Sequence, residues 1–383
     1  MNSLFQDHKQ ISGILLQMTD KNQSVNFIKR LFIVTAVLLV FIGVIVFVFD
    51  PFYHYHKPWL GMKAVLNDKE YQCVGSLRNF DYDALIVGSS VMENNDNSWF
   101  DDAFGVRSIK AIRSYGATAD LCYLLDVVYE EHDIKYVFYN IDPSSVYGET
   151  ATTFESTGCP MYLYDKNPFN DIYYLFNRDV LFEKIPYEVA SSFIGDYNEN
   201  LSYNWAKWKR FGSDMALGLY FRTRQVKEML PERAYEEKVK GNIALIEEEV
   251  KSHPETEFIF FYPSYSMLWW DLTYREGETD AIIYCEKEIT KALLKYDNVK
   301  VFCFQNEPEI TTNLDNYMDT IHFSPDINKW MLDQILLGKY QVTEENLDSV
   351  FDGVKNFSDK VQDDYIKYYE ENDLLNYQEV PDE

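Results

Sequence analysis

The chain has 383 residues and a formal net charge of −27. This acidic balance argues against binding to nucleic acid or to anionic lipid surfaces, both of which require basic patches. Five cysteines are present, but none forms a C-x-x-C pair or a metal-ligand spacing, so we expect no zinc site; we expect no cofactor either. Their odd number means at least one unpaired thiol or an intermolecular bond. The length allows one large α/β domain with an insertion, or two small domains.

Residues 31–49 form an apolar run without a charged residue. At helical rise the run spans about 28 Å, close to the hydrocarbon thickness of a bilayer. Lys29 and Arg30 precede it, so the positive-inside rule predicts a cytoplasmic N-terminus (1–30) and export of everything that follows. A cleaved signal peptide and a buried core helix are the alternatives. The run lacks a small-residue cleavage site and a polar face, so we predict an uncleaved signal anchor that crosses the plasma membrane once.

Residues 50–79 are an aromatic juxtamembrane connector. Asp50, His54 and His56 would share one side of an extended strand there and resemble metal ligands. No further ligand is nearby, and aromatic residues are common at the lipid interface, so we expect no metal site.

Apolar runs alternate with helical patterns through most of the remaining chain. This alternation is typical of βαβ units and predicts an α/β fold, a doubly wound parallel sheet covered on both faces. Residues 144–230 break the rhythm, and we interpret them as an aromatic-rich insertion over one end of the sheet within an α/β domain of residues 80–340. Residues 341–383 form an acidic C-terminal extension with some helical spacing. The predicted strands are 82–87, 107–113, 135–141, 257–262 and 299–304, and the predicted helices are 119–130, 234–252, 279–296 and 326–337.

Two motifs carry the chemistry that a serine nucleophile needs. Gly88-Ser89-Ser90 follows the first predicted strand, and Asp319-x-x-His322 follows the last. The carboxyl ends of parallel strands meet at one edge of a sheet, so the histidine can approach the serine there. A serine with a histidine base and an orienting carboxylate is a catalytic triad. The alternatives are a helix-capping serine, a structural histidine and a capping aspartate.

On these motifs and the alternating elements around them, the chain resembles the SGNH (GDSL-type) hydrolases, particularly their membrane-anchored DltD-like and alginate-acetylation-like branch. The resemblance covers roughly residues 80–140 and 255–340 and implies a flavodoxin-like sheet. It makes Ser90 the nucleophile, with Ser89 in place of the family's Asp, His322 the base and Asp319 its partner.

The same resemblance implies an oxyanion hole completed by a Gly and an Asn from the second and third sequence blocks. Gly116 and Asn140 are the candidates, although Tyr139-Asn140-Ile141-Asp142 departs from the family's Gly-x-Asn-Asp pattern. Backbone N–H groups at the Ser89 turn are a further candidate, since a turn can direct them at an oxyanion. Ser264 and Ser266 end a strand at the same edge, where they either line the pocket or form a plain turn.

These features together predict a membrane-anchored extracytoplasmic serine acyl-esterase or O-acyltransferase. Its substrate would be acyl groups of cell-surface glycan, carried on Ser90. The resemblance to the anchored branch implies a membrane-bound acyl-transport protein as its partner. A non-catalytic glycan-binding or scaffolding protein that retains the fold is one alternative. A lipid esterase that uses the anchor to reach its substrate is another.

Overall fold

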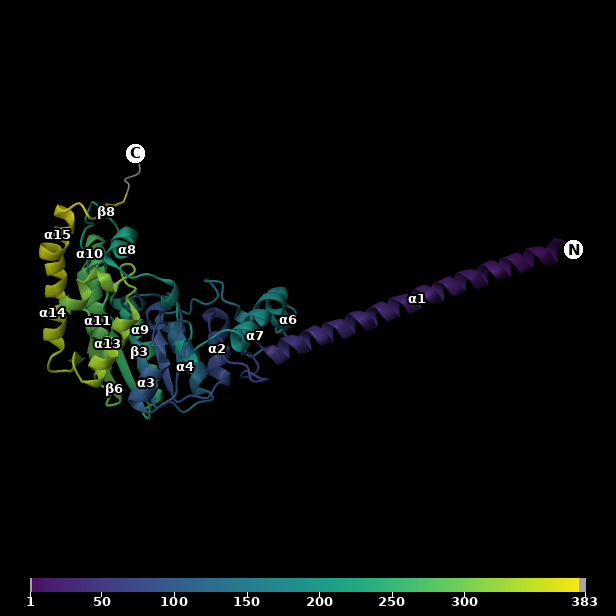
Figure 1. Ribbon diagram of the computed structural model, residues 1–383, viewed down its shortest axis with the longest axis horizontal. Helices are drawn as coiled ribbons and strands as arrows, with labels where there is room; N and C mark the ends of the chain where they lie inside the picture. Colours follow the sequence, from purple (N-terminus) through teal and green to yellow (C-terminus); the bar gives the residue numbers. More distant parts are fainter. Residues whose placement is uncertain (1, 379–383) are drawn as a thin grey trace.

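The computed structural model describes residues 2–378, with side chains from residue 23 onward. Helix α1 (Asn2–Phe49) projects from the rest of the molecule as one long rod (Figure 1). Its part Gln23–Phe49 is long and apolar enough to cross a membrane. The structure therefore contains the apolar N-terminal helix that the sequence predicts, and this helix begins well before residue 31 because the polar residues that precede the apolar run are also helical.

A six-stranded sheet forms the centre of the domain, in the order β2-β1-β3-β5-β6-β7. The first five strands are parallel, and β7 joins the β6 edge antiparallel. All five predicted strands lie in this sheet. Its members are β1 (Ala84–Gly88), β2 (Ser108–Ile112), β3 (Tyr136–Asn140), β5 (Glu257–Tyr262), β6 (Val299–Cys303) and β7 (Gln341–Val342).

Helices cover both faces of this sheet. All five residues of β1 are buried, and successive side chains of a strand point to opposite faces, so neither face is open to solvent there. The apolar runs of the sequence are continuous for this reason. The longer helices of the domain are α2 (Lys69–Asn79), α3 (Asn97–Phe104), α4 (Thr118–Tyr129), α9 (Glu236–Ser252), α10 (Met267–Arg275), α11 (Thr279–Leu293), α13 (Pro325–Leu336) and α14 (Leu347–Lys360).

The insertion is divided between two places, which corrects the expectation that it lies over one end of the sheet. Its first part contacts the end of α1. Its second part, around residues 203–213, reaches the turn after β1 and the loop of residues 313–317. The short elements of the insertion are α5 (Pro143–Val146), η2 (Met161–Leu163), α6 (Ile172–Leu175), η3 (Val180–Lys184), α7 (Ile185–Phe193), η4 (Glu199–Leu201), η5 (Ala206–Trp208), α8 (Ser213–Leu219) and β4 (Phe221–Arg222).

The acidic C-terminal extension packs on the α/β domain. Phe351, Val354 and Phe357 of α14 are buried, and α14 contacts α11. Strand β8 (Asn376–Tyr377) then pairs with β4 of the insertion. The apolar positions spaced along this extension therefore form its contact face, while acids such as Asp348 and Asp352 of α14 remain exposed. All five cysteines are buried and free.

Candidate active site

The turn after β1 places Ser90 at the carboxyl edge of the sheet. Gly88 ends the strand with a φ of +156°, and a Cβ atom there would lie 2.6 Å from Met92 Cγ and 3.0 Å from Asn140 Cβ. Glycine is therefore required for this close approach. Ser90 then opens a short 3₁₀ turn, η1 (Ser90–Met92), and its side chain is partly exposed.

The loop that carries His322 is a tight turn built by Asp319. Asp319 Oδ1 accepts hydrogen bonds from the backbone N–H groups of Ile321 (2.9 Å) and His322 (2.8 Å). Met318 N also donates to His322 O at 2.9 Å. The three-residue spacing of Asp319 and His322 is thus the spacing of an Asx-type turn, which holds the carboxylate beside the imidazole.

Ser90, His322 and Asp319 form one hydrogen-bonded chain. Ser90 Oγ lies 2.8 Å from His322 Nε2, and His322 Nδ1 lies 2.7 Å from Asp319 Oδ2. An ionised carboxylate only accepts, so Nδ1 donates to Asp319 and Nε2 is left to accept the Ser90 proton. The structure thus brings together all three residues that the two motifs single out, in the geometry that a serine nucleophile requires.

The electrostatics of the loop keep Asp319 ionised. Burial raises the pKa of Asp319, but the hydrogen bonds and the charge of His322 together with two backbone N–H groups outweigh burial, and the net pKa is lowered. The side chains of His322 and Asp319 are 15% and 23% exposed, so the pair is sheltered but reachable from solvent.

The three oxyanion candidates differ in what their polar groups contact. Both polar atoms of the Asn140 side chain are buried without a hydrogen-bond partner in the part of the chain that the structure describes, and Asn140 lies against Gly88. Gly116 N instead donates to Arg113 O at 3.2 Å. Ser89 Oγ donates to Asp142 Oδ2 at 3.2 Å. Asn140 therefore has an uncommitted side-chain donor beside the turn, whereas the Ser89 hydroxyl and the Gly116 N–H group are already bonded.

Ser264 and Ser266 are fully buried and hold the histidine loop instead of facing an open pocket. Ser264 Oγ donates to Phe304 O (2.6 Å), and the backbone oxygen of Ser264 accepts from Tyr317 OH (2.7 Å). Ser266 Oγ donates to Thr320 O at 2.7 Å and caps α10 by accepting from Leu268 N. Their hydroxyl groups are used in these bonds, so we assign them a positioning role.

Trp205, which the sequence does not single out, contacts both Ser90 and His322. Its Nε1–H donates to Ser90 O at 2.9 Å, and its ring lies edge-on to the His322 ring, with centroids 5.1 Å apart. Asn94, four residues after Ser90, accepts a hydrogen bond from Ala206 N at 3.0 Å and so fixes the same segment. Trp205 lies in an irregular, aromatic-rich segment, where no periodicity distinguishes it from its aromatic neighbours.

Lys110 of β2 connects the same turn to the insertion. Its amine donates to Glu93 O (2.8 Å) and Ser202 O (2.6 Å), and complete burial lowers its pKa to about 7. Strand β2 is thereby bonded both to the backbone just after Ser90 and to the insertion.

The connector residues that resemble metal ligands do not converge on one point. Asp50 accepts from the backbone N–H groups of residues 54–56, and His54 Nε2 faces Asp171 Oδ1 at 3.2 Å. The two ring nitrogens of His56 face the carbonyl oxygens of Phe47 and Lys57. Among the side chains described, no group of three or more ligating residues could hold a metal ion.

A cavity of about 340 Å³ lies at the other end of the sheet from Ser90. Met62, Ser108 and Ser202 are among its lining residues, and Ser108 is the first residue of β2. Parallel sheets bind ligands at their carboxyl edge, and in this sheet that edge holds Ser90, His322 and Asp319 and not the cavity. We therefore place the candidate site at Ser90, although the cavity is elsewhere. No protein-family model matches the chain, and no curated protein matches it either.

Proposed function

We propose that this chain is a membrane-anchored serine acyl-esterase or O-acyltransferase that acts on acyl groups of cell-surface glycan. The observation that carries the proposal is the chain of hydrogen bonds from Ser90 Oγ through His322 to Asp319, at 2.8 and 2.7 Å. We further propose the flavodoxin-like SGNH fold, because the parallel strands run 2-1-3-5-6 and β4 lies outside the sheet.

In the proposed reaction Ser90 Oγ attacks the acyl carbonyl while its proton passes to His322 Nε2. The alkoxide of the first substrate leaves with that proton, and the acyl group remains on Ser90 as an ester. Water or a sugar hydroxyl then attacks this ester, gives its proton to His322, and releases the acyl group from Ser90, which recovers the proton. Asp319 holds the imidazole tautomer throughout. Asn140 Nδ2 is the side-chain donor we assign to the oxyanion.

The shape of the site supports a large substrate. Ser90 and His322 are partly exposed at the sheet edge, and Trp205 forms one border of the site. A polymer that lies on the surface can reach such a site, and the Trp205 ring offers it an apolar face, while the N–H group of that ring is bonded to Ser90 O. Attachment through α1 would keep the site near the cell surface. An adjacent membrane protein that delivers acyl groups is the partner we propose.

We propose that the domain lies outside the cytoplasm, because Lys29 and Arg30 precede the apolar run and the positive-inside rule then favours a cytoplasmic N-terminus. An alkaline phosphatase reporter fused after Glu383 should therefore be active in intact cells. If a reporter that is active only in the cytoplasm were active at the same position, the proposed topology would be wrong.

Turnover of short-chain p-nitrophenyl esters tests the enzymatic function. Ser90→Ala should lower kcat by on the order of 10⁴-fold or more, because the other triad residues have no nucleophile to activate. Ser89→Ala is the matched control and should keep most of the activity, since the Ser89 hydroxyl is bonded to Asp142. Equal turnover by wild type and Ser90→Ala would refute the proposal.

A non-catalytic glycan-binding protein with the same fold is the second candidate. The bond from Gly116 N to Arg113 O favours it, because that N–H group is not free to bind an oxyanion in this conformation. Glycan binding without any Ser90-dependent ester turnover would support this second candidate.

A further inference from the structure

The last turns of α1 are covered by the insertion. Val46 is fully buried, and α6 and η3 both contact α1. A Cβ atom on Gly43 would lie 3.9 Å from the ring of Phe176. Figure 1 shows α6 and α7 at the base of the long helix, on the side of the domain from which α1 leaves.

This contact determines how far from the bilayer centre residues 169–194 lie. Gly43 lies six residues before Phe49, which is about 9 Å along a helix. Residues 31–49 are only just long enough to cross the hydrocarbon core of a bilayer, and the charges of Lys29 and Arg30 oppose a shift of the helix toward the domain side, since that shift would draw them into the core. A side chain beside Gly43 therefore lies at or below the headgroups on the domain side.

Large apolar side chains of this part of the insertion point to the outside. Phe182 is 68% exposed and Ile194 is 88% exposed. We call residues 169–194 the collar. Its exposed large apolar and aromatic residues are Phe169, Ile172, Tyr173, Phe176, Phe182, Tyr187, Phe193 and Ile194. So many exposed large apolar side chains within residues 169–194 mark a contact surface.

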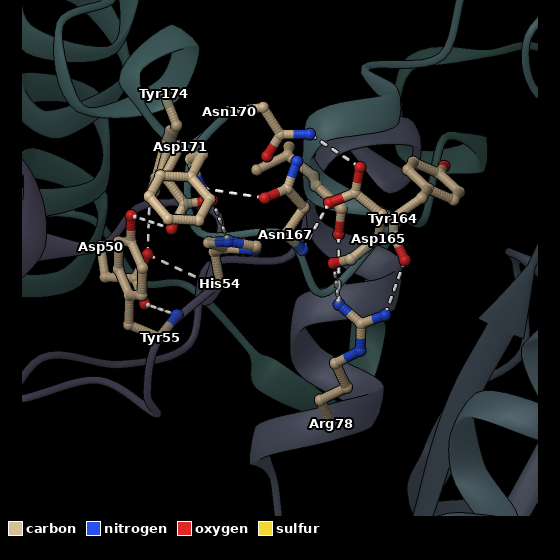
Figure 2. Close-up of polar contacts among 12 residues, drawn as sticks. Asp50, His54, Tyr55, Arg78, Tyr164, Asp165, Asn167, Asn170, Asp171 and Tyr174 are labelled. Atoms are coloured by element: carbon tan, nitrogen blue, oxygen red, sulfur yellow. Dashed lines mark hydrogen bonds and ion pairs between the residues drawn. The ribbon is translucent and has the colours of Figure 1, made fainter.

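Several acidic side chains in and beside the collar point inward instead. Figure 2 shows Asp50 and Asp171 enclosed by His54, Tyr55 and Tyr174. Tyr174 OH donates to Asp50 Oδ1 at 2.7 Å, and Tyr55 OH donates to Asp171 Oδ2 at 3.0 Å. This arrangement places apolar groups outside and the two hydrogen-bonded carboxylates inside, which is the order expected at a lipid surface.

Glu188, on the collar itself, follows the same rule. It is buried and accepts hydrogen bonds from Tyr53 OH (3.1 Å) and Gln72 Nε2 (3.0 Å). Arg178, Asp179 and Glu183 remain exposed, which fits insertion to the level of the headgroups and the adjoining acyl chains, not deeper.

The junction between α1 and the domain holds the collar in this position. Asp50 accepts three backbone N–H bonds from residues 54–56, and a Cβ atom on Gly75 would lie 2.4 Å from Phe52 O. Helix α2 therefore packs directly on the connector, and the domain cannot move freely about the end of α1. Within the connector the Trp59 ring stacks on His56. Aromatic residues are common at membrane interfaces.

We infer that the collar inserts its apolar side chains among the lipid acyl chains around α1, so that the domain is held on the bilayer by a surface as well as by a helix. The occupant of this surface is lipid, because the collar is continuous with the membrane-crossing helix and touches it at membrane depth. The inference is independent of the proposed chemistry at Ser90.

Site-directed labelling of the full chain in vesicles tests this inference. Phe182→Cys and Ile194→Cys each carry an environment-sensitive fluorophore, and Tyr368→Cys is the matched control. Tyr368 is 61% exposed on α15 (Ile366–Glu371), which lies at the end of the domain farthest from α1 in Figure 1. The five native cysteines are buried, so the introduced thiol is the one that reacts. Unchanged thermal unfolding of each labelled chain shows that it is folded.

In phosphatidylcholine vesicles with a shallow doxyl quencher, the labels at 182 and 194 should lose most of their fluorescence and the label at 368 none. Emission at 182 and 194 as water-exposed and unquenched as that at 368 would overturn the inference. Protection of these labels in native membranes but not in pure lipid vesicles would also overturn it, and would identify a membrane protein as the occupant.

Discussion

Asp319 uses its two carboxylate oxygens for different purposes. Oδ1 accepts the backbone N–H groups of Ile321 and His322, which shapes the loop. Oδ2 accepts His322 Nδ1, which leaves Nε2 free to accept from Ser90. A single residue therefore builds the loop and orients the base, and the two roles can be separated by substitution.

Asp319→Asn keeps an acceptor oxygen for the loop but replaces the acceptor for Nδ1 with an amide. We expect ester turnover to fall by on the order of 10⁴-fold, because the imidazole loses its preferred tautomer. Thermal unfolding should change little, whereas Asp319→Ala should lose both turnover and stability. Near-normal turnover in Asp319→Asn would reduce Asp319 to a loop-building residue.

The second part of the insertion, around residues 203–213, stabilises the Ser90 turn. Trp205 donates to the carbonyl of Ser90, and Ala206 N donates to Asn94 in the same turn. Lys110 adds a bond from β2 to Ser202 and Glu93. The irregular segment thus bonds directly to the backbone of the nucleophile, and strand β2 bonds both to the same turn and to that segment.

Trp205→Phe removes the N–H group that donates to Ser90 O and keeps an aromatic ring beside His322. We expect kcat for ester turnover to fall about tenfold with little change in KM, because a misplacement of the nucleophile affects the transition state more than binding. Trp208→Phe is the matched control, since Trp208 is exposed and lies three residues further along the chain. An equal effect of both substitutions would mean that Trp205 acts only through general packing.

Much of the fold could be predicted because its strands are buried on both faces. Residues 257–262 read as a strand from their apolar content and are one in the structure. Helix α10 was not predicted, since it follows directly on the Ser264 turn and is buried over most of its length, which removes the amphipathic signal. The divided insertion was not predictable either, because its contacts join residues more than a hundred positions apart, such as Gly43 with Phe176.

Some residues of the candidate site could likewise be predicted from the sequence, and others could not. Ser90 and His322 could be paired from the sequence because both follow strands whose carboxyl ends meet at one edge. The roles of Ser264, Ser266 and Trp205 could not, since each depends on which backbone carbonyl lies within reach of its side chain.

For the whole molecule, a buried carboxyl group makes stability depend on pH. Glu286 is fully buried on α11, with Gln305 Nε2 donating to it at 2.7 Å, and burial raises its pKa to about 8. Between its ordinary value of 4.5 and about 8 the folded chain holds a proton that the unfolded chain has lost. The stabilisation is therefore complete below pH 4.5 and is lost as the pH rises toward 8.

Glu286→Gln removes this titration while it preserves the shape of the neutral side chain. From about pH 5 to pH 8 the stability of the wild type should fall relative to that of the variant by up to about 1.4 kcal/mol per pH unit. Urea unfolding at several pH values measures the difference. Parallel profiles for the two proteins would show that Glu286 is ionised in the folded state.

Covalent labelling measures whether His322 activates Ser90 as a nucleophile. A fluorophosphonate reacts with an activated serine, and peptide mass spectrometry identifies the residue that carries the label. We predict that the label is found on Ser90, is retained in Ser89→Ala and is lost in both Ser90→Ala and His322→Ala chains that remain folded. Absence of label from the folded wild type, or a label on Ser89 instead, would contradict the activation of Ser90 by His322.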